Sequence, residues 1–236
     1  MTEKITEAQK TEILEALGAK PSISEARGLA WMDENDLVIF SPGISTGGFA
    51  EIKMTRANYR RTVIATTIDG KGLQYAREVI NELGLEDSIQ TRLEDLRNGE
   101  NYPPESFDFI YARLVLHYLS MQDLDNVLLN FHRILKPKGK LFIIVRSVKN
   151  IAEEGPYTFN EKTKLTTIPH FDTEGNVISL ETRYFHTPES IFQHLTQAGF
   201  AIKQIEEYQE QLYKDFMRKE LALQFDHLIE VQAARQ

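Results

Sequence analysis

Short unbroken apolar runs alternate along the chain with longer stretches in which apolar residues recur at helical spacing. The run Lys140–Val145 is almost entirely apolar, and Phe107–Ala112 is apolar and aromatic. Such runs are typical of strands that are buried on both faces of a parallel sheet. Between them, apolar residues from Leu124 to Leu135 form one stripe and predict a helix that begins near Asp123. The segment 107–146 therefore predicts a strand, a crossover helix and a parallel strand, the right-handed unit of an open α/β sheet.

The same two patterns recur on both sides of this unit. Pro188 behind Thr187, with an acid in the first turn, marks the start of a further helix. Alternating strands and helices predict an α/β fold. The further strands are predicted at Leu37–Phe40, Thr62–Ile68, Ser88–Leu93, Phe200–Ile205 and His227–Ala234, and the further helices at Thr6–Leu17, Ser24–Met32, from Phe49, at Leu73–Leu83 and from Thr187 to Ala198.

The segment 150–186 interrupts this alternation. Two stretches, Thr163–Phe171 and Asn176–Phe185, favour strands, and Asp172–Asn176 favours a tight turn between them. We therefore expect a β-hairpin inserted after the fifth strand. Its two histidines match no zinc-binding spacing, so no metal site is expected. A later segment, Gln209–Gln224, is expected to form a helical or lid-like connection.

Composition narrows the class of protein. The chain has 236 residues, 42% of them hydrophobic and 26% charged, which suits one globular domain. It has no cysteine, which excludes disulfides and thiolate chemistry. No signal peptide or membrane-spanning run is recognisable, so we expect a cytoplasmic protein without membrane contact. A net charge of −8 disfavours a nucleic-acid partner and favours a small-molecule substrate, while the oligomeric state stays open, a homodimer included.

Glycines follow the first predicted strand in the sequence SPGISTGG, and a helix begins directly after them. Glycine lets the backbone approach a ligand, and the free N–H groups at the start of a helix attract negative charge. The spacing is neither the G-x-G-x-x-G fingerprint of dinucleotide-binding proteins nor a phosphate-binding loop ending in Lys-Ser/Thr. By itself the loop is compatible with a ligand site or with an ordinary tight turn.

Four sequence segments together resemble one family. They are the FD at Phe107, LVLHYL just after it, RILKPKGKL, and FHTPESIFQHLTQAGFAIKQIEEY near the C-terminus. These segments resemble the class I, Rossmann-like methyltransferases that depend on S-adenosyl-L-methionine (SAM). The resemblance implies a three-layer α/β/α fold, with a mostly parallel seven-stranded sheet whose antiparallel last strand lies beside the fifth. One methyltransferase-like domain would span 1–236, with a helical cap at 1–35 and the hairpin insertion at 150–186 as a lid.

The glycine loop aligns without a gap to the family's pattern of an acid, an apolar residue and G-x-G-x-G. Ser41 then takes the place of the acid, and Ser45 takes the place of the middle glycine. The absent acid removes the expected contact to the cofactor's ammonium group. Ser45 puts a side chain where the backbone normally approaches the cofactor.

The resemblance also assigns roles at the ends of the second and third strands. Thr67 takes the place of the acid that binds the ribose, and Asp69 is either its substitute or a turn cap. Asp95, or its neighbour Glu94, would accept a hydrogen bond from the adenine amine. The full set of candidates for binding SAM is Ser41, Pro42, Gly43, Ile44, Gly47, Thr67, Ile68, Glu94, Asp95 and Arg113.

Side chains near the ends of the fourth and fifth strands are the candidates for the reaction. His117 and Arg146 are the catalytic candidates, although His117 is equally compatible with a hydrogen-bonded core residue and Arg146 with solvation of the sheet end. The implied reaction is in-line transfer of the methyl group of SAM to a small molecule, with S-adenosyl-L-homocysteine (SAH) as product. Such a transfer depends mainly on alignment and electrostatics. Substrate contacts are expected from Tyr111, His170, Tyr184 and His186.

The departures at Ser41, Ser45 and Thr67 keep a second class of function open. In this alternative the chain is a methyltransferase homologue that has lost SAM binding and serves as a binding or regulatory protein. A nicotinamide-dependent oxidoreductase ranks third, because both the fingerprint glycines and the ribose acid are missing.

Overall fold

The computed structural model of the chain describes residues 6–99, 101–152 and 156–236. The first five residues of the predicted cap and residues 153–155 of the predicted insertion lie outside these ranges. Within them the helices are α1 (Glu7–Gly18), α2 (Ile23–Trp31), α3 (Phe49–Ala57), α4 (Gly70–Glu82), α5 (Met121–Ile134) and α6 (Pro188–Gln197), with short 3₁₀ turns η1 (Leu96–Asn98), η2 (Leu116–Tyr118) and η3 (Val148–Ala152). The strands are β1 (Val38–Pro42), β2 (Thr62–Thr67), β3 (Ile89–Leu93), β4 (Phe107–Arg113), β5 (Leu135–Arg146), β6 (Thr158–Phe159), β7 (Thr166–Phe171), β8 (Val177–Arg183), β9 (Phe200–Glu210) and β10 (Asp226–Arg235).

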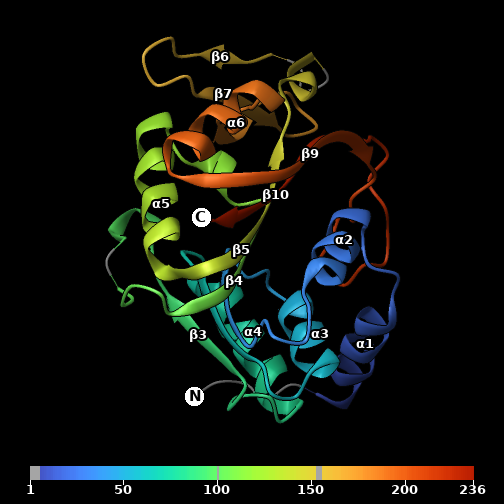
Figure 1. Cartoon of the computed structure of the whole chain (residues 1–236). Coiled ribbons are helices and arrows are strands. Elements are labelled where there is room, and N and C mark those ends of the chain that lie inside the picture. The colour runs from blue at the N-terminus through green and yellow to red at the C-terminus, as the bar shows by residue number, and fades with distance from the viewer. Residues whose placement is uncertain (1–5, 100, 153–155) are drawn as a thin grey trace.

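Seven of the described strands form the central sheet, in the order β3-β2-β1-β4-β5-β10-β9 (Figure 1). The first five pair in parallel, whereas β10 runs antiparallel to both β5 and β9. The strand order reverses between β1 and β4, so the carboxyl ends of these two strands diverge into a crevice. The predicted fold class is confirmed, including the antiparallel last strand.

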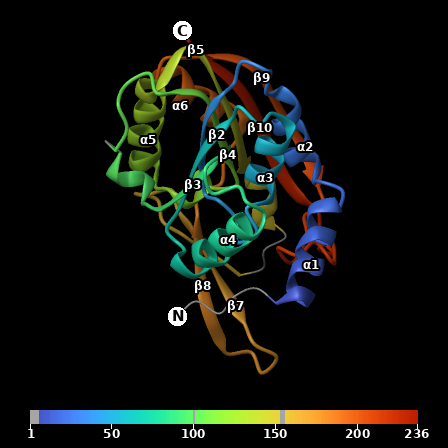
Figure 2. The ribbon, with the colours of Figure 1, turned by 90° about the horizontal axis from the view of Figure 1, so that it is seen from below.

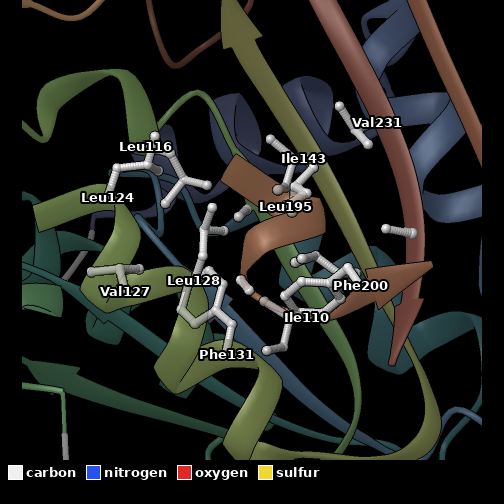
Figure 3. Packing of buried hydrophobic residues seen from close by; sticks show 14 of the residues in the cluster. Ile110, Leu116, Leu124, Val127, Leu128, Phe131, Ile143, Leu195, Phe200 and Val231 are labelled. Atoms are coloured by element: carbon white, nitrogen blue, oxygen red, sulfur yellow. The ribbon is translucent and has the colours of Figure 1, made fainter. Parts of the chain in front are cut away.

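Helices cover both faces of this sheet because each helix has one apolar stripe to bury. α5 and α6 pack on one face, and α1, α3 and α4 on the other (Figure 2). Figure 3 shows the first of these layers, where Leu124, Leu128 and Phe131 of α5 meet Leu195 of α6 and Ile110 of β4. All five side chains are buried. β4 and β5, between the two layers, are apolar on both faces, as their sequences predict.

The starts of the helices follow the expected local chemistry. The hydroxyl of Ser120 accepts a hydrogen bond from the N–H of Asp123 at the start of α5. Thr187 forms a reciprocal capping box with Ser190, and Pro188 occupies the first turn of α6. These caps satisfy N–H groups that have no partner inside the helix. The predicted helices are therefore present, with starts that differ by a few residues at most from those expected.

The predicted hairpin is present as β7 and β8, which pair antiparallel and extend away from the main sheet (Figure 2). The side chain of Asp172 accepts hydrogen bonds from the N–H groups of Glu174 and Asn176, and Gly175 has φ +86°. This is the tight turn that the sequence predicts. The two-residue strand β6 adds a third strand to the hairpin that the sequence did not reveal.

The helical interpretation of Gln209–Gln224 is wrong. β9 continues to Glu210 because β10 supplies backbone partners along its whole length. A loop follows, with one isolated bridge between Tyr213 and Leu221 and a left-handed residue, Arg218, at φ +59°. Leu212 and Met217 of this loop pack against the core on the α3 side. Pairing between distant strands outweighs the helical propensity of the segment.

Candidate functional site

A large cavity of about 420 Å³ opens at the carboxyl ends of β1, β2 and β3. Ligand pockets commonly measure about 300–1,000 Å³, so this one has room for a ligand of nucleoside size. Apolar side chains line most of it and acidic side chains lie at its rim. Its walls are formed by Gly43, Thr66, Thr67, Ile68, Glu94, Asp95, Leu96, Arg97, Leu114, Val115, Tyr118, Leu119 and Asp123. We call it the large cavity.

The glycine loop after β1 forms one wall of this cavity. Gly43 has φ +82°, and a Cβ atom built there would lie 2.8 Å from Cβ of Val115. Its N–H donates to the carbonyl of Thr66, as does the N–H of Ile44. Gly47 lies under the ring of Phe49, where a Cβ atom would meet the ring at 2.8 Å. The loop thus needs glycine at both positions, at Gly43 for backbone conformation and close approach and at Gly47 for packing.

The acidic rim of the large cavity carries Glu94 and Asp95. Asp95 accepts hydrogen bonds from the backbone and the guanidinium of Arg97, which hold the pKa of its carboxyl below the usual range. Glu94 accepts a hydrogen bond of 2.8 Å from the hydroxyl of Tyr102. Asp69 accepts from the N–H of Lys71 and caps α4, which is the turn-capping role considered for it. Asp95 is therefore an ionised acceptor at the cavity edge.

A small cavity of about 60 Å³ lies on the other side of Gly43, which lines both cavities. A cavity needs a volume of about 10–15 Å³ to hold one water molecule, so this one can hold several ligand atoms. Charged and polar side chains dominate its walls, in contrast to the large cavity. They belong to Glu25, Ser41, Pro42, Gly43, Ser45, Ala50, Glu51, Tyr111, Arg113 and Arg218. We call it the small cavity.

Two hydrogen-bonded groups shape the small cavity. The hydroxyl of Ser41, at the end of β1, donates to Glu51 of α3 over 2.5 Å. Arg113, at the end of β4, donates to the hydroxyls of Ser22 and Ser24 over 2.7 and 2.8 Å. The beginning of α2 is thereby tied to the sheet edge. The predicted N-terminal cap therefore packs on the sheet and also lines a cavity.

The carboxylate of Glu25, from α2, has two cationic partners. Lys53 lies 3.0 Å and Arg218 2.5 Å from its oxygens. Burial opposes the negative charge, but Arg218 and Lys53 outweigh it and lower the pKa of Glu25. The guanidinium of Arg218 also lies over the ring of Phe49. These contacts bring the loop after β9 over the small cavity.

A third group of predicted residues, near the ends of β4 and β5, lines neither cavity, although Val115 and Tyr118 on either side of His117 line the large cavity. His117 and His186 are 1% and 0% exposed, and within the described residues none of their ring nitrogens has a hydrogen-bond partner. Burial lowers the pKa of His117 well below its usual value, with Arg146 and Arg183 adding to the shift, and lowers that of His186 to about 3. We call these two residues the buried histidine pair.

The remaining candidates for catalysis and substrate binding are Arg146, Tyr184 and His170, and their contacts show where each one lies. Arg146 forms an ion pair with Asp226 of β10. The ring of Tyr184 lies 4.3 Å from that of His186. His170 is on the exposed hairpin and contacts Glu181 over 3.2 Å. His170 therefore lies apart from the buried histidine pair.

The structure brings most of the predicted cofactor residues together. Gly43, Thr67, Ile68, Glu94 and Asp95 line the large cavity. Ser41, Pro42, Gly43 and Arg113 line the small cavity, together with Tyr111, which was predicted as a substrate contact. Neither cavity is lined by Ile44 or Gly47, whose contacts are with the core and the loop itself.

Three charged residues of the small cavity, Glu25, Glu51 and Arg218, were not among the sequence candidates. For Glu51 a signal was present: Ser41 leaves an acidic position empty, and Glu51 is a nearby carboxylate on the following helix. Glu25 and Arg218 are nearly 200 residues apart in the chain, and no local pattern connects them.

Within the described ranges, no group of three or more histidine, cysteine or acidic side chains is arranged to hold a metal ion. A helix with the length and apolar character needed to cross a membrane is likewise absent from the described residues.

Comparison with known proteins identifies the fold. No match was found among curated proteins. Residues 41–143 match the family model described as "Methyltransferase domain". Among solved structures, a SAM-dependent methyltransferase from Methanosarcina mazei is similar with a TM-score of 0.68 and 15% identity, over 87% of this chain and 95% of that one.

Two further solved structures are similar over most of the chain. One is a SAM-dependent methyltransferase from Mesorhizobium loti, with a TM-score of 0.62 and 20% identity over 93% of this chain and all (100%) of that one. The other is a geranyl diphosphate methyltransferase in complex with GPP and sinefungin, with a TM-score of 0.63 and 11% identity over 90% and 76% of the two chains.

Proposed function

Because the chain carries a methyltransferase domain in a class I, Rossmann-like fold, we propose that it binds SAM and transfers the methyl group to a small molecule. The observation that carries this proposal is the large cavity. It lies at the carboxyl edge of a parallel sheet, beside the point where the strand order reverses, which is where α/β folds bind ligands.

The lining of the large cavity suits an adenosine group. Ile68, which is 74% exposed, and Leu96, Val115 and Leu119 offer apolar surface for a flat aromatic base. Asp95 is ionised and placed to accept a hydrogen bond from an exocyclic amine. The adjoining small cavity offers charged groups for the amino-acid end of the same molecule, and it contains a buried hydroxyl, that of Tyr111, that has no partner within the described residues. The residues present thus fit SAM.

In this proposal the protein binds and aligns the reactants and excludes water from them. Bound SAM supplies a methyl group on a sulfonium sulfur that is ready for displacement. Gly43, shared by the two cavities, lets the backbone approach the middle of the bound molecule. His117 stays uncharged at neutral pH because of its burial, so it keeps a lone pair for a substrate proton. Positioning of this kind, together with electrostatic stabilisation, is how a protein lowers the barrier of such a transfer.

A small-molecule substrate is favoured over a nucleic acid by the net charge of −8. One of the similar structures is named for such a substrate, geranyl diphosphate. Arg146, His117 and His186, near the ends of β4 and β5, are our candidates for contacts with the accepting molecule, together with Tyr184. Cytoplasmic localisation remains part of this proposal.

Isothermal titration with SAM and SAH tests the proposal directly. We expect both ligands to bind, and Asp95→Asn to weaken both about 10- to 100-fold, because a hydrogen bond to an ionised acceptor contributes about 1.5–3 kcal/mol. Asp69→Asn is the matched control: Asn also caps helices, so affinity should stay within about twofold of the wild type. Methyl transfer is then assayed with SAM and candidate small molecules.

A second function is favoured by a specific observation, the serine and threonine at positions where the family has acids. In that case the chain is a binding or regulatory protein that no longer holds SAM. Absence of heat with either SAM or SAH at millimolar concentration would favour this alternative and count against the proposal.

A further inference from the structure

Ser41 ends β1 at the position where the resembling family has an acid, but a carboxylate is nevertheless present there. It belongs to Glu51, ten residues later, in the first turn of α3. The hydroxyl of Ser41 donates to Glu51 Oε1 over 2.5 Å, and both side chains line the small cavity. The charge that the end of β1 lacks is therefore supplied by the next helix.

The burial of Glu51 makes this carboxylate unusual. The residue is 3% exposed, and within the described residues no lysine, arginine or histidine forms an ion pair with it. Burial raises the pKa of its carboxyl, and the hydrogen bond from Ser41 and the positive charge of Arg113 offset this only in part. A buried charge without an ion-pair partner is costly, and groups whose pKa is shifted in this way cluster at functional sites. Glu51 is thus a buried acceptor without an ion-pair partner among the described residues.

The other residues that line the small cavity indicate which kind of ligand would supply a cation to Glu51. Arg113 offers positive charge beside Glu51, which suits a carboxylate, and the buried hydroxyl of Tyr111 has no partner within the described residues. Glu25 is already neutralised by Lys53 and Arg218. A group that carries an ammonium and a carboxylate on one carbon satisfies Glu51 and Arg113 together.

We propose that Glu51 binds the ammonium group of the amino-acid end of SAM, and so replaces the acid that the family places at the end of β1. The assignment rests on the proposed function and deepens it by naming the residue that recognises this end of the molecule. Ser41 positions the carboxylate, Arg113 faces the cofactor's carboxylate, and Gly43 marks the passage from the large to the small cavity.

Two ligands separate this role from a merely structural one. SAH carries the amino-acid end, whereas 5′-methylthioadenosine keeps the adenosine and the thioether but lacks both charged groups. Their affinities are measured by isothermal titration for the wild type, for Glu51→Gln and for Glu25→Gln. Gln keeps the shape of the side chain and can still accept from Ser41, and Glu25→Gln alters the other carboxylate of the same cavity.

We expect Glu51→Gln to weaken SAH binding about 10- to 100-fold, the usual effect of losing a hydrogen bond between charged groups. Binding of 5′-methylthioadenosine should stay unchanged, and Glu25→Gln should reduce SAH binding less. The double variant S41D/E51Q, which returns a carboxylate to the end of β1, should regain part of the SAH affinity. Thermal melting verifies that each variant folds, and Glu51→Asp replaces Glu51→Gln if that variant does not.

The outcomes are distinguishable. Equal effects of Glu51→Gln on both ligands, or none on SAH, overturn the role of Glu51 while leaving the proposed function intact. A selective loss in Glu25→Gln alone also overturns it and transfers the role to Glu25. Failure of the wild type to bind either ligand instead refutes the proposed function on which the inference rests.

Discussion

At the scale of single residues, the buried histidine pair shows how burial decides a protonation state. His117 and His186 lie where neither imidazole has a hydrogen-bond partner within the described residues. Both pKa values are lowered from 6.5, that of His186 to about 3. The folded protein therefore binds protons at these sites less readily than the unfolded chain. Their contribution to stability is present above pH 6.5 and is lost as the pH falls below it.

We expect the free energy of unfolding to fall by about 3 kcal/mol between pH 7.5 and pH 5.5 through these two residues together. Urea unfolding at a series of pH values measures it, and the double variant H117Q/H186Q should remove this part of the dependence. Replacing His170, on the exposed hairpin, is the control and should leave the pH dependence as it is. Identical pH profiles for the wild type and the double variant would contradict the prediction.

Glu51 changes the stability with pH in the opposite direction to the buried histidine pair, and the two contributions can be measured separately. Burial raises the pKa of its carboxyl above 4.5, so its contribution to stability is present below that pH and is lost as the pH rises through the folded value. The dependence on Glu51 therefore has the opposite sign to that of the buried histidine pair. Measuring the free energy of unfolding of Glu51→Gln and of H117Q/H186Q over one pH series assigns each part of the pH dependence to its residues.

At the scale of elements, α2 matters because it closes the small cavity. Gly28 lets this helix lie directly on the sheet: a Cβ atom there would come within 2.5 Å of the ring of Tyr111 and 2.6 Å of that of Phe142. These two rings are stacked at 5.6 Å and occupy neighbouring strands. The absence of one side-chain carbon thus determines how closely α2 approaches the site.

Gly28→Ala should lower the free energy of unfolding by about 1–3 kcal/mol, because overpacking forces the helix and the rings apart. SAH affinity should fall as well, since Ser22, Ser24 and Glu25 would move with the helix. Gly18→Ala, at the end of α1, is the matched control: nothing lies within 4 Å of its added carbon, and stability should change by less than about 1 kcal/mol. Urea unfolding and isothermal titration measure the two effects. Equal stability of both variants would argue against close packing of α2.

At the scale of the whole molecule, the two apolar layers share one sheet. Residues of β4, β5 and β10 contribute alternate side chains to both layers, so neither layer can unfold without exposing the other. The cavities lie at the edge of this shared sheet, and their walls combine residues from the ends of β1 to β4 with residues from α2, α3 and the loop after β9. Ligand binding should therefore be coupled to the unfolding of the entire domain.

We expect a single thermal transition, shifted upward as a whole by SAH. A ligand at 100 times its dissociation constant adds about 2.7 kcal/mol, which corresponds to about 5–10 °C for a domain of this size. Scanning calorimetry with and without SAH measures the shift, and adenine alone serves as the comparison ligand. Two separate transitions, only one of them moved by SAH, would mean that the N-terminal cap or the insertion unfolds independently.

The sequence alone determined the elements and their layering. Apolar runs and helical stripes such as those at Lys140–Val145 and Leu124–Leu135 report the faces that a segment must bury, and that information is local. For the same reason the sequence could place Asp95 at the sheet edge, because this residue follows a predicted strand. Pairing partners are not local, so the extension of β9 to Glu210 escaped prediction, and the sequence left the segment after it open between a helical and a lid-like connection.

Only the tertiary structure decided which charges surround the site. The small cavity gathers Glu25 from α2, Glu51 from α3 and Arg218 from the loop after β9, segments with no shared pattern in the sequence. Their electrostatic roles depend on distance and burial, which chain order does not encode. In the sequence, Ser41 at the end of β1 indicated a possible loss of cofactor binding. In the fold, the carboxylate of Glu51 lies against this serine.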